Sequence, residues 1–192
     1  MNNNLIKLHA KSFYWASFFL SKKIFLKSSS LYNFCRTLDD IVDGPEDLDL
    51  KKQKFLQFKN DFINKNFNNK IIQEMWDIMK SEYISKIIVL DLFDGVETDL
   101  KEKVILNNKK DLMMYSYRVA GTVGLMMSKI LKVEDKNALR GAINLGIAMQ
   151  FTNIARDIVE DKKRKRKYIN HNFSSLKEII SDSEILYDRS FQ

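Results

Sequence analysis

Carboxylates spaced one helical turn apart occur at two places in this 192-residue chain, and the first lies in its N-terminal quarter. On a helix, Asp39 and Asp43 share one face, which Arg36 and Tyr32 continue towards the N-terminus. Two like charges at this spacing destabilise an isolated helix by about 0.2–0.5 kcal/mol, so a group of carboxylates favours a bound cation. Mg²⁺ suits such a site because it takes oxygen ligands and is often shared between carboxylates and substrate phosphates. By itself, this stripe is equally consistent with a solvated acidic helix end.

A second polar stripe repeats the pattern near the C-terminal end of the chain. Asp157 and Asp161 are again one turn apart, and Asn153 and Gln150 precede them on the same helix face. These side chains would be costly to bury without polar partners. Two stripes with the same carboxylate spacing are harder to explain as surface than one. If they face each other in a helical bundle, they could hold metal ions between the helices.

Few residues in the chain break helices, since it contains one Pro and six Gly. This composition predicts an all-α fold, and the length favours a single domain over residues 1–192 with an apolar core of its own. A loop and the start of a further helix are expected to follow the main helical segments. Those segments are predicted at approximately residues 5–20, 30–44, 47–64, 71–90, 93–101, 110–131 and 134–162.

The net charge of +7 fits anionic ligands, an anionic membrane surface or nucleic acid, but no nucleic-acid-binding motif is present and we expect no such partner. Cys35 is the single cysteine, which excludes a disulfide within the chain and favours a reducing cytoplasm. No apolar run is long enough to span a bilayer. We therefore expect a cytoplasmic protein and leave open a peripheral contact with the inner face of the membrane. The basic run Lys162–Lys167 is predicted to be a solvated loop, with such a contact as an alternative.

Five segments resemble, in order and spacing, motifs of the squalene and phytoene synthase family. They are His9–Tyr14, Asp39–Asp43, Tyr117–Gly124, Arg156–Asp161 and Arg166–Tyr168. The resemblance implies an all-α, isoprenoid synthase-like helical bundle around a central cavity. Because the chain stops soon after the second aspartate motif, we expect the C-terminal helices of other family members to be missing.

The resemblance also implies roles for particular residues. It implies Mg²⁺, with Mn²⁺ as an alternative, held against the substrate diphosphates by Asp39, Asp43, Asp157 and Asp161. It implies substrate contacts from Ser12, Phe13, Arg36, Tyr117, Asn153, Arg166 and Tyr168. It implies catalytic contributions from Tyr32, Arg36, Gln150 and Asn153.

The activity that the resemblance implies is the head-to-head joining of two prenyl diphosphates through a cyclopropylcarbinyl diphosphate. The leading prediction is a phytoene synthase type, which converts two geranylgeranyl diphosphates to phytoene through prephytoene diphosphate. A squalene synthase type, using farnesyl diphosphate and NADPH, is an alternative. A non-catalytic relative acting in scaffolding or assembly is favoured by the short chain and disfavoured by the four aspartates. A head-to-tail synthase or terpene cyclase is disfavoured by the residues flanking those aspartates.

Overall fold

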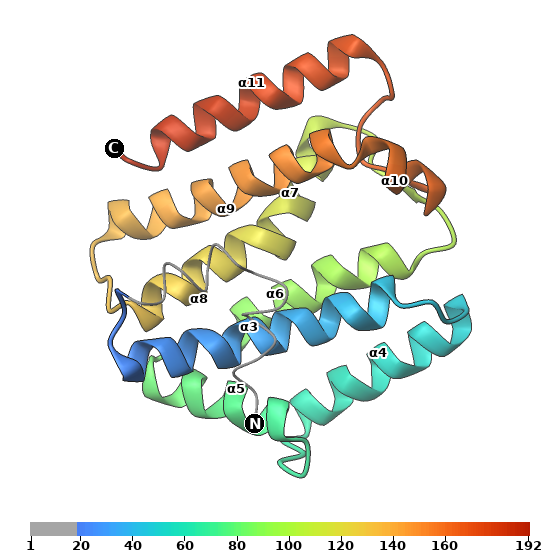
Figure 1. Cartoon of the computed structure of the whole chain (residues 1–192). Coiled ribbons are helices and arrows are strands. Elements are labelled where there is room, and N and C mark those ends of the chain that lie inside the picture. Colours follow the sequence, from blue (N-terminus) through green and yellow to red (C-terminus); the bar gives the residue numbers. More distant parts are fainter. Residues whose placement is uncertain (1–18) are drawn as a thin grey trace. The chain divides into compact units, whose positions relative to one another are not determined.

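The computed structural model describes residues 19–192, which are mostly α-helical (Figure 1). The helices are α3 (Lys22–Asp43), α4 (Leu48–Ile63), α5 (Lys70–Ser81), α6 (Lys86–Glu97), α7 (Lys109–Ser116), α8 (Thr122–Ile130), α9 (Lys136–Arg156), α10 (Ile158–Lys163) and α11 (Phe173–Arg189). Shorter elements are the 3₁₀ turn η1 (Thr98–Leu100), the π-helical turn η2 (Tyr117–Gly121) and the two-residue strands β1 (Val104–Ile105) and β2 (Arg166–Lys167). The predicted all-α class is confirmed. Ser12 and Phe13, predicted to contact substrate, lie outside the described residues.

The chain forms two compact units. The first extends to Ile84 and includes Lys129–Lys132, and the second contains Ser85–Ser128 and Val133–Gln192. The first aspartate stripe belongs to the first unit and the second stripe to the second unit. That the units fold as one domain around a central cavity stays a prediction of the sequence.

The core of the first unit is aromatic and forms where α3 packs against α4 and α5. The ring of Phe34 in α3 lies 5.5 Å from that of Phe58 and 5.9 Å from that of Phe62, measured between centroids. All three side chains are buried. Burial of this face of α3 leaves Asp39 and Asp43, on its other side, exposed.

Helix α3 begins at Lys22, eight residues before the predicted start at residue 30. The serines at 28–30, beside the predicted start, lie inside the helix. Ser28 Oγ donates to the carbonyl of Ile24 at 2.9 Å and Ser29 Oγ to that of Phe25 at 2.7 Å. These bonds to the preceding turn satisfy the hydroxyls without interrupting the helix. The N-cap is Ser21, whose side chain accepts from the backbone N–H of Ile24.

The helix predicted over residues 71–90 is two helices, α5 and α6. The break follows from Tyr83, whose φ of 54° is left-handed and cannot continue an α-helix. Ser85 then caps α6 by accepting from the N–H of Ile87. The segment predicted at 93–101 is therefore the end of α6 followed by η1.

Glu82 lies at this break and is fully buried among cations of the first unit. Its carboxylate pairs with Lys27 of α3 and with Lys132, and accepts from Ser81 Oγ at 2.9 Å. Burial alone would raise the pKa of this carboxyl from its ordinary 4.5, but the hydrogen bonds from Lys132, Lys27 and Ser81 outweigh burial and lower the pKa to about 2. The ionised side chain therefore stabilises the fold above about pH 4.5 and loses that contribution as the pH falls towards 2.

Replacing Glu82 by glutamine should lower the free energy of unfolding by about 3 kcal/mol at neutral pH, because two cations lose a buried partner. The difference in the free energy of unfolding between wild type and variant should decrease as the pH falls below about 4.5. Denaturant unfolding followed by circular dichroism over that pH range measures both effects. A matched control is Glu46→Gln, which removes a pairing with Lys54 nearer the surface and should cost much less. A difference that does not change with pH would contradict this assignment.

The second unit is built on α9, which packs against α11 and against η2 (Figure 1). Its core contains the buried side chains of Val104, Leu112, Tyr115, Ile147, Ala148, Phe151, Ile154, Tyr168, Ile179 and Leu186. The strands β1 and β2 pair in parallel, with Val104 opposite Arg166. This pairing joins the segment after η1 to the segment after the second aspartate stripe.

Candidate active site

The first stripe is a surface of α3 on which charges gather around a tyrosine. Arg36 Nη2 lies 2.8 Å from Asp40 Oδ1, so Arg36 forms an ion pair with Asp40, one turn along the helix. Tyr32 is half-buried, and burial is the largest cause of its raised pKa. The Arg36 guanidinium opposes that rise, whereas the charges of Asp39 and Asp40 add to it. The geometry thus brings Tyr32, Arg36 and the acidic residues together, as the spacing predicts.

The second stripe differs from its prediction because the helix expected over 134–162 is interrupted. Helix α9 ends at Arg156, and Asp157 (φ −99°, ψ 15°) joins it to α10. The stripe survives because the Asp157 N–H still donates to Asn153 O at 2.8 Å and the Asp161 N–H to Asp157 O at 2.9 Å. The two carboxylates therefore remain about one turn apart.

Arg156 holds the Asp157 carboxylate by two hydrogen bonds. Its Nε donates to Oδ1 at 2.7 Å and its Nη2 to Oδ2 at 2.6 Å. The Arg156 hydrogen bond is the largest cause of the lowered pKa of Asp157, which stays ionised. The pairing fixes the direction of a carboxylate that stands at a helix break. Asn153 and Gln150, one and two turns earlier, are half-buried.

Asp161 is in a different electrostatic environment from Asp157. Its pKa is raised to about 6, first by burial and then by the charges of Asp157 and Asp99, although Arg166 and Arg164 oppose the rise. The two arginines therefore offset only part of the cost of ionising the Asp161 carboxyl. A divalent cation bound at Asp161 would instead lower the pKa of this carboxyl. Carboxylate oxygens are ligands that Mg²⁺ prefers.

Asp99 is a site residue that sequence reasoning missed. It lies in η1, and its carboxylate accepts from Tyr168 Oη at 2.6 Å and from Tyr115 Oη at 2.7 Å. The Arg166 Nε lies 3.9 Å from Asp99 Oδ1. Burial, and next the charge of Asp99, raise the pKa of both tyrosines, which keeps them protonated as donors. No spacing rule marked this residue, because its partners lie far away in the sequence.

The predicted substrate contacts Arg166 and Tyr168 are buried, which corrects part of the prediction for the basic run. Lys162–Lys165 are exposed, although Lys162 and Lys163 form the end of α10, whereas Arg166 is only 8% exposed. Strand pairing explains the difference: Val104 N–H donates to Lys165 O at 3.2 Å and Leu106 N–H to Lys167 O at 3.1 Å. Next to the paired strands, the rings of Tyr168 and Tyr115 stack with their centroids 4.8 Å apart.

Tyr117, the remaining predicted substrate contact, lies at the first position of η2. Its hydroxyl donates to Asp91 Oδ2 at 3.3 Å, and it is half-buried. Burial raises its pKa, and the neighbouring Asp91 raises it further. The helix predicted over residues 110–131 is interrupted here by this π-helical turn, a feature often found at functional sites.

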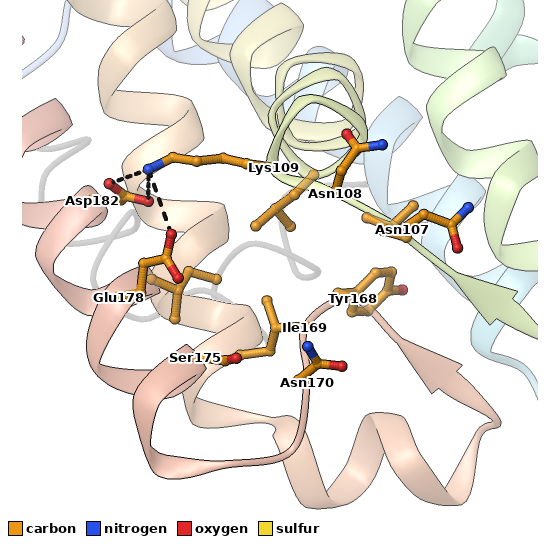
Figure 2. A pocket seen from close by; sticks show the side chains of 12 residues that line it. Asn107, Asn108, Lys109, Tyr168, Ile169, Asn170, Ser175, Glu178 and Asp182 are labelled. Carbon is orange, nitrogen blue, oxygen red and sulfur yellow. Dashed lines mark hydrogen bonds and ion pairs between the residues drawn. The ribbon is translucent and has the colours of Figure 1, made fainter.

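A pocket of about 150 Å³ opens beside Tyr168 within the second unit (Figure 2). Lys109 crosses its wall to Asp182, 2.6 Å away, and to Glu178, 3.9 Å away. Among the described residues that line it, Tyr168 is the one predicted site residue, so this pocket is not the proposed site of the second aspartate stripe.

Residues 19–192 contain neither a membrane-spanning helix nor a cluster of metal-binding side chains. No helix in this range is long and apolar enough to cross a membrane. Within the same range, no group of three or more His, Cys, Asp or Glu side chains could hold a metal ion. The assignment of Asp39, Asp43, Asp157 and Asp161 to a metal therefore stays a prediction.

The sequence matches a family model described as squalene/phytoene synthase over residues 6–183. That match covers most of the chain, together with both aspartate stripes, Asp99, Arg166 and Tyr168. The chain therefore belongs to the squalene/phytoene synthase family, which confirms the resemblance drawn from the five motifs.

Several curated relatives are phytoene synthases. The chain is 31% identical to a bifunctional lycopene cyclase/phytoene synthase of Pyrenophora tritici-repentis, over 96% of this chain and 35% of the relative. It is 30% identical to a 15-cis-phytoene synthase of Pantoea ananas, over 88% of this chain and 61% of the relative. The chain thus spans between about a third and three fifths of the length of these two relatives.

Solved structures show the same fold. A dehydrosqualene synthase in complex with ligand is similar with a TM-score of 0.78 and 27% identity, over 98% of this chain and 74% of that chain. A squalene synthase HpnC from Alicyclobacillus acidocaldarius has a TM-score of 0.77 at 18% identity, over 97% of this chain and 79% of that chain, and shows the fold alone. The predicted isoprenoid synthase-like helical fold is confirmed.

Proposed function

We propose that this chain catalyses the head-to-head condensation of two geranylgeranyl diphosphates to phytoene through prephytoene diphosphate. The observation that carries the proposal is the 30–31% identity to phytoene synthases over 88–96% of the chain, in a sequence that carries both aspartate stripes. A purely structural relative would have no need to keep two carboxylate pairs together with Arg166 and Tyr168.

The metal is expected to be Mg²⁺, held by Asp39, Asp43, Asp157 and Asp161 with oxygens of the substrate diphosphates. The environment of Asp161 supports this assignment, because burial and the charges of Asp157 and Asp99 raise its pKa to about 6, and a bound cation would stabilise the ionised carboxylate. When bound, Mg²⁺ would neutralise the charge that develops on the departing diphosphate.

The protein's own cations and hydroxyls would bind and orient the diphosphate. Arg166 presents a planar guanidinium suited to phosphate oxygens, and burial strengthens its electrostatic effect. Arg36 would act in the same way from the first stripe. Arg156 would maintain the direction of Asp157 rather than bind substrate, since two of its donors are used on that carboxylate.

The proposed reaction balances without an external reductant. The first coupling breaks the C–O bond of one diphosphate, and the C=C bond of the second substrate is used to form two new C–C bonds, the second of which closes the cyclopropane ring as a proton is released. The second ionisation breaks the C–O bond of the remaining diphosphate, and loss of another proton after rearrangement gives phytoene. The squalene alternative would end with hydride delivery from NADPH in place of the second proton loss.

Incubation of the purified chain with Mg²⁺ and either the C15 or the C20 diphosphate, with and without NADPH, tests the proposal. We expect a C40 hydrocarbon from the C20 substrate without NADPH. A C30 product from the C15 substrate would instead indicate a squalene or dehydrosqualene type, separated by its need for NADPH. The absence of both turnover and Mg²⁺-dependent diphosphate binding would contradict the proposal and favour a scaffold role.

A further inference from the structure

Two neighbouring elements of the second unit, β1 and η1, both contact the segment 165–168. Strand β1 fixes its backbone by the hydrogen bonds to Lys165 O and Lys167 O. The turn η1, just before β1, supplies Asp99, whose carboxylate reaches the side chains of Arg166 and Tyr168. A single stretch of chain, residues 98–106, therefore orders both the backbone and the side chains of this segment.

The Asp99 carboxylate accepts hydrogen bonds from two tyrosine hydroxyls. Each tyrosine hydroxyl has one proton, and the hydroxyls of Tyr168 and Tyr115 lie 2.6 and 2.7 Å from different oxygens of Asp99. Distances this short are typical of charge-assisted hydrogen bonds. The side chains of Asp99 and Arg166 are 11% and 9% exposed, so solvent screens their attraction poorly.

We propose that Asp99 is the positioning residue for the diphosphate contacts of this site: its carboxylate holds Arg166 and Tyr168 in the orientation that binds diphosphate. The inference rests on the proposed function, because it assigns Asp99 a task within that same site. Asp99 itself, being an anion, is not expected to touch the diphosphate. It acts through the guanidinium of Arg166 and the hydroxyl of Tyr168.

The direction in which one substitution changes the affinity for pyrophosphate distinguishes a positioning role of Asp99 from a simple effect of its charge. Asp99→Asn keeps the size of the side chain but removes one negative charge. If Asp99 only repelled the anionic ligand, this variant would bind Mg²⁺–pyrophosphate more tightly. If Asp99 positions Arg166 and Tyr168, the variant should bind about tenfold more weakly, because residues in one hydrogen-bonded network are strongly coupled.

Titration calorimetry of the full chain with Mg²⁺ and inorganic pyrophosphate measures this difference. Asp182→Asn is the matched control, because it removes a carboxylate of the same unit that pairs with Lys109, and it should leave the dissociation constant unchanged. If Asp99→Asn fails to fold, Tyr115→Phe removes one of the two hydroxyl donors instead and should weaken pyrophosphate binding in the same direction, by less.

A variant that lacks both partners shows whether Asp99 affects pyrophosphate binding through Arg166 and Tyr168. In an Arg166→Gln, Tyr168→Phe double variant, adding Asp99→Asn should change the dissociation constant less than twofold. A further tenfold loss in that background would overturn the inference, since Asp99 would then act by another route. The inference would also be overturned if the wild-type chain binds pyrophosphate and the single variant Asp99→Asn binds it equally or more tightly. A wild-type chain that binds no pyrophosphate would instead contradict the proposed function and remove the basis of the inference.

Discussion

Replacing Asp157 by asparagine should lower the turnover of prenyl diphosphate at least a hundredfold, with helicity unchanged. The carboxylate lies at the junction of α9 and α10, where its backbone N–H donates to Asn153 O and its backbone carbonyl accepts from the Asp161 N–H. Asparagine keeps both of those backbone bonds. It removes one of the negative charges proposed to bind Mg²⁺, and the electrostatic contribution of a catalytic metal amounts to several kcal/mol. A loss of about 2.7 kcal/mol corresponds to the hundredfold effect.

Product formation from the C20 diphosphate under saturating Mg²⁺, together with far-UV circular dichroism, measures this prediction. Asp188→Asn is a suitable control because it removes an exposed carboxylate of α11 in the same unit, and it should retain full turnover. If Asp157→Asn kept more than about a tenth of wild-type turnover, the metal assignment of the second stripe would be wrong.

Replacing Gly146 by valine should lower the free energy of unfolding by about 3 kcal/mol. A Cβ at this position would lie 2.4 Å from Ala120 O, 2.8 Å from Ala120 C and 3.0 Å from Gly121 Cα. These are backbone atoms of η2, so no side-chain rotation can relieve the contact. The added side chain would force α9 and η2 apart and strain the packing at the centre of the second unit.

The control for Gly146→Val is Ala138→Val, an exposed position in the first turn of α9. It tests the helix propensity of valine alone and should cost less than about 1 kcal/mol. Chemical denaturation of both variants gives the comparison. Equal stabilities for the two variants would show that the close approach of α9 to η2 does not limit the side chain at position 146.

Periodicity in the sequence predicted the parts of the site that lie on regular helices. In α3, Leu31, Phe34 and Leu38 repeat at helical spacing and are buried, and that alone places Asp39 and Asp43 on the exposed side. In α9, Asn153 keeps the expected relation to Asp157, because hydrogen bonding continues across the helix break. The metal-binding role of these residues stays a prediction.

Features that depend on contacts distant in sequence could not be predicted in this way. Asp99 gains its partners from Tyr115 and Tyr168, which folding brings to it from other elements. Arg166 belongs to a run of basic residues, and only its pairing with β1 distinguishes it from the exposed lysines before it. The left-handed Tyr83 was missed because a non-glycine residue in that conformation leaves no sequence signal.

Binding of Mn²⁺, followed by electron paramagnetic resonance with and without inorganic pyrophosphate, tests most directly whether the two aspartate stripes serve one ligand. We expect pyrophosphate to increase Mn²⁺ binding by the wild-type chain. Asp43→Asn and Asp157→Asn should each abolish most of that increase, and the double variant should lose little more than either alone. A shared metal–diphosphate site would be contradicted if the losses of Mn²⁺ binding in the two single variants add in the double variant. It would also be contradicted if pyrophosphate did not change Mn²⁺ binding by the wild-type chain.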